Sequence, residues 1–145
     1  MRDARRPPRP YALAAVQLFV GLGALYGGGS LVADRSGAAL GMPLELLARS
    51  PFDDYLVPGL TLLLVNGVGS LVGVALSLAR VRVAGALGLV LGAFLAAWIA
   101  LQVLWIGPIS WFQPMILSCG LAEAWLGVRA HRHGARAAAV SGARF

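Results

Sequence analysis

The chain has 145 residues, of which 59% are hydrophobic and 12% charged, with a net charge of +6. Soluble domains carry about 25% charged residues, so this composition excludes an ordinary soluble domain and indicates a single membrane domain. All twelve basic residues are arginines that flank apolar runs, which favours contact with anionic lipid and argues against nucleic acid as a partner.

Four apolar runs lie between two basic tails, at residues 1–10 and 129–145, and we expect the second tail to be loose. The predicted spans cover about residues 11–32, 55–79, 83–106 and 110–128. Each is near the roughly 20 apolar residues that one crossing needs. Gly107-Pro108 separates the last two runs. The sequence therefore predicts an all-α fold, a four-helix transmembrane bundle over residues 11–128.

Arginine counting orients this bundle. The two tails and the Arg80–Arg82 turn carry ten of the twelve arginines, whereas the loop at residues 33–54 carries two. Positive charge stays in the cytoplasm, so both termini are predicted to be cytoplasmic and the long loop to be outside. Aromatic residues expected at the two interfaces are Phe52, Tyr55, Trp105, Trp111 and Phe112 outside, and Tyr11 and Trp125 inside.

The long loop contains two features. Residues 43–49, PLELLAR, predict a short amphipathic helix with Pro43 in its first turn. Its leucines could lie on the membrane surface while Glu45 and Arg49 face water, or the segment could fold onto the bundle. The acidic and aromatic residues that follow are candidates for a recognition face outside the membrane. These candidates are Phe52, Asp53, Asp54 and Tyr55.

Small residues recur every four positions in three spans, which predicts helix faces that allow close backbone approach. The rows are Gly23 and Gly27 in the first span, Gly69, Gly73 and Ser77 in the second, and Gly88, Gly92, Ala96 and Ala100 in the third.

Glu123 is the only acidic or basic residue well within a predicted span. It lies six residues before Arg129, about 9 Å from the cytoplasmic end at 1.5 Å per residue. Gln17 lies at a similar depth in the first span. We therefore predict that Glu123 faces Gln17 or reaches a cytoplasmic arginine. A structural anchor and a proton or ligand site are both open as roles.

Other polar residues lie deeper or towards the outside. Asn66 is near mid-membrane, where its amide needs a hydrogen-bond partner from another helix or a ligand. Judged by depth alone, several side chains are candidates for a polar pocket that opens outward beneath the long loop. They are Asn66, Tyr26, Gln102, Gln113 and Ser118.

Few residues in the sequence suggest chemistry. His131 and His133 have metal-ligating side chains but stand among arginines, so a solvated tail is the better interpretation. Cys119 lies in a span, where a thiol is usually inert packing, and a lone cysteine cannot form an intramolecular disulfide. No catalytic set, phosphate-binding loop or metal quartet is recognisable in the sequence, so we predict no catalytic residue, cofactor or metal.

Two motifs, PFDDYLVPGL at residues 51–60 and SWFQP at residues 110–114, carry a resemblance. Together with Asn66-Gly67, they are similar to motifs in a group of small, uncharacterised bacterial four-span integral membrane proteins. The resemblance covers most of residues 20–128. It implies a bacterial plasma-membrane location, with no activity and no functional residues to carry over.

Three functions follow as hypotheses. The first is a non-enzymatic binding or accessory module in the lipid bilayer. Its recognition face would be the outer motif at residues 51–58. The alternative is a small transporter or channel that acts as a homo-oligomer, with Glu123 and Asn66 lining the path. The third is a membrane-embedded enzyme with a lipid-like substrate against Asn66 or Gln102. The sequence leaves open whether the partner is a second copy or a larger membrane protein.

Overall fold

A computed structural model describes residues 10–142 of the chain, and side-chain burial for residues 10–136. The basic tail expected at residues 1–10 lies almost entirely outside the described residues. The elements of the bundle are α1 (Tyr11–Ala33), α2 (Leu56–Thr61), η3 (Leu62–Val68), α3 (Gly69–Leu78), α4 (Ala84–Ile106) and α5 (Phe112–Gly142). The loop after α1 contains two 3₁₀ helices, η1 (Ala38–Leu40) and η2 (Leu44–Arg49). The described residues form helices and no strand, which confirms the all-α class.

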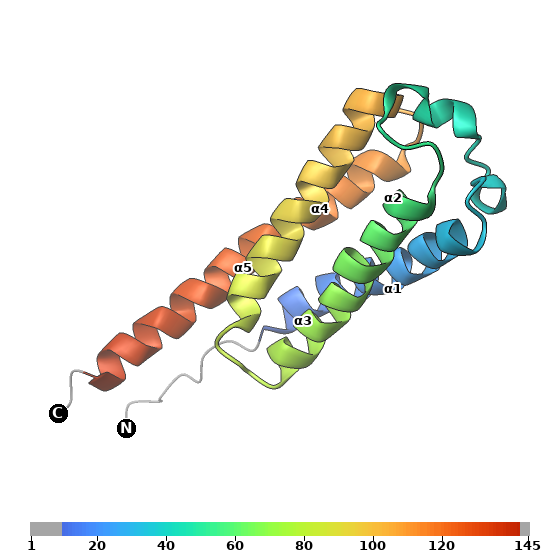
Figure 1. Ribbon diagram of the computed structural model, residues 1–145. Coiled ribbons are helices and arrows are strands. Elements are labelled where there is room, and N and C mark those ends of the chain that lie inside the picture. Colours follow the sequence, from blue (N-terminus) through green and yellow to red (C-terminus); the bar gives the residue numbers. More distant parts are fainter. Residues whose placement is uncertain (1–9, 143–145) are drawn as a thin grey trace.

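The helices form a bundle of antiparallel neighbours (Figure 1). Because η3 is a π-helical stretch between α2 and α3, these three elements form one continuous helix, Leu56–Leu78. This helix packs along α1, and α4 packs along α5. The start of α1 and the α3–α4 turn lie at one end of the bundle. The long loop and the α4–α5 turn lie at the other (Figure 1).

Among residues 10–142, three helices are long and apolar enough to cross a membrane: Tyr11–Ala33, Leu56–Leu78 and Ala84–Ile106. Their bounds agree closely with the first three predicted spans. Large apolar side chains are exposed on the outer faces of these helices, for example Phe19, Leu64 and Val90. Contiguous exposed apolar surface of this kind marks contact with lipid or with another protein. The chain is therefore a small helical protein with several helices suited to a membrane.

The fourth long helix differs from the expectation for the C-terminal tail. We predicted a loose segment after Val128, but α5 continues to Gly142. Residues 129–142 consist mainly of alanine and arginine, two of the best helix formers, and contain no proline. The extension begins as a packed continuation of α5, because a Cβ on Gly85 of α4 would lie 2.5 Å from the backbone nitrogen of His131.

The segment predicted as a short amphipathic helix is instead the 3₁₀ helix η2. Its Leu47 is buried in a small cluster with Leu31 and Tyr55, whereas Leu44 is exposed. Of the two arrangements considered for this segment, packing onto the bundle is the one that Leu47 adopts. Six residues are too few for an α-helical apolar stripe, and one inward leucine is enough to hold the segment in place.

Two side chains organise the rest of the long loop. Tyr55 is 2% exposed, and its hydroxyl donates a hydrogen bond of 3.1 Å to the Pro43 carbonyl oxygen. The Asp34 carboxylate accepts hydrogen bonds from the hydroxyl of Ser36 at 2.6 Å and from the backbone N–H of Ala39 at 3.0 Å. These bonds stabilise the charged carboxylate and hold the pKa of Asp34 below its ordinary value. The loop is thus a folded cap at one end of the bundle.

Glycines bring α4 and α5 into backbone contact. A Cβ atom placed on Gly92 would collide with the backbone nitrogen of Ala124, and one on Gly127 with the backbone nitrogen of Leu89. The predicted small-residue row of the third span therefore does lie partly at a helix interface. Ala100, its last member, is exposed, and Gly88, its first, faces the Leu13 side chain of α1.

The other two predicted rows had different outcomes. In the second span, Gly73 and Ser77 are buried at the contact with α1, as expected. In the first span, Gly23 has open space around it, and the close approach is made by Gly28, whose Cβ would lie 2.6 Å from the backbone nitrogen of Leu63. Several glycines lie within this stretch of α1, so spacing alone did not indicate which ones face the neighbouring helix.

Candidate functional site

Glu123 and Gln17 are both completely buried in the interior of the bundle. Gln17 lies on α1 and Glu123 on α5, and the amide is close enough to the carboxyl group to interact with it electrostatically. No hydrogen bond of acceptable geometry joins the two groups, however. The Gln17 Oε1 atom instead accepts a weak hydrogen bond of 3.4 Å from the Ser77 hydroxyl.

Glycines on two further helices make room for the Gln17 amide. A Cβ atom on Gly73 would lie 2.7 Å from the Gln17 Cδ atom, and one on Gly88 would lie 3.5 Å from Nε2. Gly73 belongs to α3 and Gly88 to α4, so the amide is enclosed by backbone on two sides. The carboxyl group of Glu123 approaches from α5. All four long helices therefore contribute to this point of the structure.

Two buried serines extend the polar interior along the continuous helix Leu56–Leu78. Asn66, Ser70 and Ser77 are at most 1% exposed. Their spacings of four and seven residues place them on one helix face, together with Gly73. This face is turned towards α1, where a Cβ on Gly21 would lie 3.3 Å from the Ser70 Cβ. We call the set Gln17, Asn66, Ser70, Ser77 and Glu123 the polar core.

Sequence reasoning missed Ser70 and treated Ser77 only as a small residue. The signal that could have found them is the heptad-like spacing of polar and small residues at positions 66, 70, 73 and 77. A row of that kind in an otherwise apolar span predicts one polar stripe, and such a stripe must face the protein interior.

Six side-chain atoms of the polar core have no hydrogen-bond partner among the described residues. They are Gln17 Nε2, both amide atoms of Asn66, Ser70 Oγ and both carboxyl oxygens of Glu123. Burying a polar group without a hydrogen bond costs free energy. Each such atom in a folded protein therefore calls for an explanation, such as a bound ligand or a catalytic role. Asn66 also lies in the π-helical stretch η3, and such stretches occur frequently at functional sites. One carboxyl, two amides and two hydroxyls can hold a proton or hydrogen-bond a small polar guest.

The outward-opening pocket expected from residue depth does not assemble. Tyr26 is 73% exposed on the outer face of α1. Gln113 is buried but engaged with the α4–α5 turn, where its Nε2 donates to the Gly107 carbonyl oxygen at 3.2 Å. The Ser118 hydroxyl donates to the Pro114 carbonyl oxygen at 2.8 Å. Gln102 borders a cavity of about 40 Å³ beneath the long loop, and none of the other candidates lines that cavity. Depth placed these residues at the correct end, but helix rotation turns them in different directions.

The four recognition candidates have separate positions. Tyr55 is buried, and the Phe52 ring packs edge-to-face on Trp105 with centroids 5.9 Å apart. The Asp54 carboxylate accepts a hydrogen bond of 2.9 Å from the Leu56 backbone N–H at the start of α2. Asp53 is exposed. Three of the four therefore attach the loop to the bundle, and Asp53 is the one free to meet a partner.

Among residues 10–136, no group of three histidine, cysteine, aspartate or glutamate side chains could hold a metal ion. The fold and the polar core together define a small α-helical protein with several helices that suit a membrane. Within the part whose burial is described, Glu123 is the one buried carboxyl group. No protein-family model matches the chain, and no curated protein or solved structure is significantly similar to it.

Proposed function

We propose that the chain is a four-span protein of the bacterial plasma membrane with both termini in the cytoplasm. In this proposal it acts as a non-enzymatic binding or accessory module. The observation that carries the accessory role is the position of Glu123. Its carboxyl group is enclosed by the bundle beside Gln17. It borders neither the 40 Å³ cavity beneath the long loop nor a second outer cavity, a groove of about 390 Å³ between η2 and the end of α4. In this proposal the Glu123 side chain holds α5 against α1 by packing, although its two carboxyl oxygens have no hydrogen-bond partner among the described residues.

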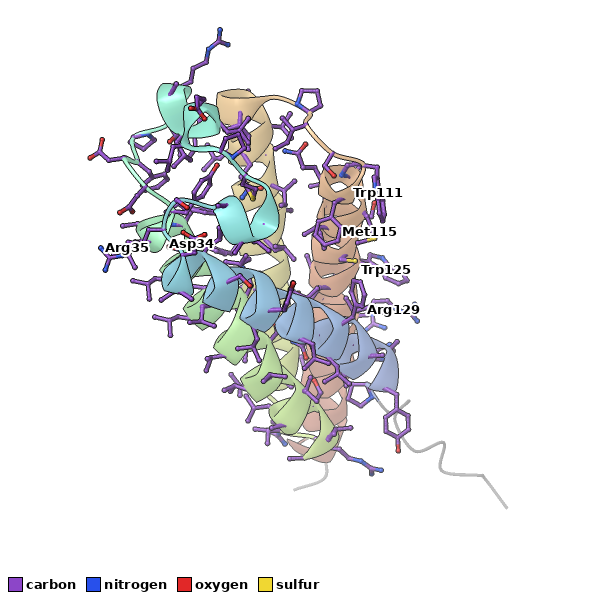
Figure 2. The ribbon with its side chains drawn as sticks, turned by 90° about the vertical axis from the view of Figure 1, so that its right-hand side faces the viewer. Asp34, Arg35, Trp111, Met115, Trp125 and Arg129 are labelled. Carbon is purple, nitrogen blue, oxygen red and sulfur yellow. The ribbon has the colours of Figure 1, made fainter. Side chains whose placement is uncertain are left out.

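Side chains of α5, together with Trp111 directly before it, support a fourth crossing. Trp111 and Trp125 are 76% and 57% exposed, and the Arg129 guanidinium lies 4.7 Å from the Trp125 ring centroid. Figure 2 shows the three residues along the same side of α5. Trp111 and Arg129 are 18 residues apart, about 27 Å along a helix, close to the hydrocarbon thickness of roughly 30 Å. Tryptophan and arginine at such a separation are typical of the two membrane interfaces. The one charged group between them, Glu123, is turned inward.

Cysteine labelling tests the proposed topology, because the chain has a single native cysteine. In a Cys119→Ala background, single cysteines are placed at Asp53 and at Arg82, both exposed positions. A membrane-impermeant maleimide added to intact spheroplasts should label Asp53→Cys and spare Arg82→Cys. Lysis should make both reactive. Labelling of Arg82→Cys before lysis would overturn the proposed orientation.

One observation favours the alternative function, a transporter, and it is the length of the polar core. Its buried residues extend from Ser77, near the end that carries Arg80, to Asn66, over about 16 Å of helix. Asn66 borders neither outer cavity, so the polar stripe is not continued to the opposite end by those cavities. In this alternative, several copies together would have to complete a path across the membrane.

Native mass spectrometry of protein gently extracted from its own membrane tests the accessory role. We expect a stable complex with a larger membrane protein. If Asp53 is part of the docking face, Asp53→Lys should release that partner, whereas Arg82→Gln at the opposite end should leave the complex intact. A homo-oligomer with no other subunit would contradict the accessory role and favour the transporter.

A further inference from the structure

A groove of about 390 Å³ lies at the outer end of the bundle, between η2 and the last turn of α4. Figure 1 shows the loop that contains η2 lying against this end of α4. One wall consists of Glu45, Leu46, Ala48 and Arg49, and the other consists of residues 103–107. Its size falls within the range of small-molecule sites. The polar core lies elsewhere, so this groove is a separate feature.

Two opposite charges line the groove without neutralising each other. Glu45 and Arg49 are both exposed, and neither has an ion-pair partner within the described part of the chain. The reason is the 3₁₀ geometry of η2, which has three residues per turn. Residues four apart then point about 120° away from each other, whereas in an α-helix they would be neighbours. The groove therefore presents a free carboxylate and a free guanidinium at separate places.

The end of α4 adds to the negative side of the groove. α4 ends at Ile106. The Val103 carbonyl accepts the Gly107 N–H at 3.0 Å, and the carbonyl groups of the helix residues after Val103 lack intrahelical partners. They carry the negative end of the helix dipole, which favours a cation. Glu45 and these carbonyls together suit an ammonium group, which donates three hydrogen bonds. Arg49 suits a phosphate, because a guanidinium binds phosphate oxygens through paired charge-assisted hydrogen bonds.

The floor of the groove continues into apolar surface. Leu104 is 76% exposed and Val103 37% exposed, and Leu101, one turn further into α4, is 40% exposed. Trp105 also lines the groove, and tryptophan is enriched at the level of lipid headgroups. A ligand with an ammonium group, a phosphate and long apolar chains would match all of these surfaces at once.

We propose that this groove binds one phospholipid with a phosphoethanolamine headgroup from the outer leaflet. The ammonium lies against Glu45 and the end of α4, the phosphate against Arg49, and the acyl chains along the exposed face of α4. The proposal requires this end of the bundle to lie at the headgroup level, and it holds whether or not the chain is an accessory subunit. A glycerol headgroup has no cation for Glu45, and a choline headgroup has no N–H to donate.

Lipid retention measured by native mass spectrometry tests this proposal. The delipidated full chain is incubated with equimolar dioleoyl phosphatidylethanolamine, phosphatidylcholine and phosphatidylglycerol, and the bound lipid is identified by its mass. Wild-type protein should retain one phosphatidylethanolamine in preference to the other two. Because a hydrogen bond to a charged group is strong, Glu45→Gln should reduce the preference over phosphatidylglycerol by about tenfold. Arg49→Gln should reduce the retention of all three lipids.

Two matched variants control for changes in surface charge. Asp53→Asn and Arg35→Gln alter exposed charges of the same long loop outside the groove, so they should leave the lipid preference unchanged. Because Glu45 and Arg49 are exposed, their variants should keep the thermal midpoint of the wild type. Equal retention of the three lipids by wild-type protein, or the same loss in the control variants, would overturn the proposal. So would displacement of the bound lipid by an equimolar amount of free phosphoethanolamine added to the same mixture.

Discussion

Replacing Gly92 by alanine should lower the free energy of unfolding by about 3 kcal/mol. The added Cβ would collide with the backbone nitrogen of Ala124, and a backbone atom cannot move aside as a flexible side chain can. The α4–α5 pair would have to separate along its length. Unfolding of the purified protein in detergent micelles, followed by far-ultraviolet circular dichroism, measures the effect.

A matched substitution separates packing from helix propensity. Gly23 lies on the exposed face of α1 with nothing within 4 Å of its Cβ position. Gly23→Ala should therefore be neutral, or stabilising by up to about 1 kcal/mol, because alanine is the better helix former. Gly127→Ala, at the same interface as Gly92, should be damaging, since its Cβ would lie 2.8 Å from the Gly85 carbonyl oxygen. Equal stability of the Gly92 and Gly23 variants would contradict the close packing of α4 on α5.

Glu123→Ala should destabilise the bundle by roughly 2 to 4 kcal/mol, whereas Glu123→Gln should change its stability by less than about 1 kcal/mol. The side chain is completely buried, so truncation leaves a cavity and removes the group that faces Gln17. Glutamine keeps the shape and adds an N–H donor beside the Gln17 amide. The thermal midpoints of the two variants, measured in the same micelles, test this difference.

The two Glu123 variants also discriminate between the proposed functions. If the carboxyl group serves packing alone, Glu123→Gln should retain the wild-type fold and the wild-type set of partners. A Glu123→Gln variant that folds normally but loses a measured flux in proteoliposomes would contradict that role. Destabilisation as large as that of Glu123→Ala would show that the acid itself is required, by a bound cation or a proton that the isosteric amide cannot replace.

The long loop illustrates how far residue patterns reach. The alternation of leucine and charge at residues 43–49 indicated a short helix, and η2 is helical. Whether Leu47 faces lipid or protein depends on the cluster it forms with Leu31 and Tyr55, residues that are distant in the sequence. Likewise, the polar and aromatic types in the motif PFDDYLVPGL suggested recognition. Tyr55 points inward, and the Asp54 carboxylate accepts the Leu56 backbone N–H. Both positions follow from how the loop folds back onto the helices.

The polar core shows a similar division. Depth counted from the ends of the spans put Glu123 and Gln17 at one level, and the structure has them side by side in the interior. The same counting put Tyr26 and Gln113 near Asn66, yet Tyr26 faces outward and Gln113 binds the α4–α5 turn. Distance along a helix is a sum of equal steps of 1.5 Å, so sequence position is enough to estimate it. Rotation about the helix axis depends on which neighbours pack against it.

Residue patterns alone were thus enough for the helical class, the bounds of three apolar helices and the position of each polar residue along its helix, because these follow from hydropathy and constant helix geometry. The tertiary structure decided the faces: Gly21 and Gly28 of α1 in place of Gly23, the serines beside Asn66, and the groove between η2 and α4. In a chain so rich in glycine and alanine, several faces of one helix are smooth enough to pack. The choice among them is made by contacts between residues far apart in the sequence, and no local pattern contains those contacts.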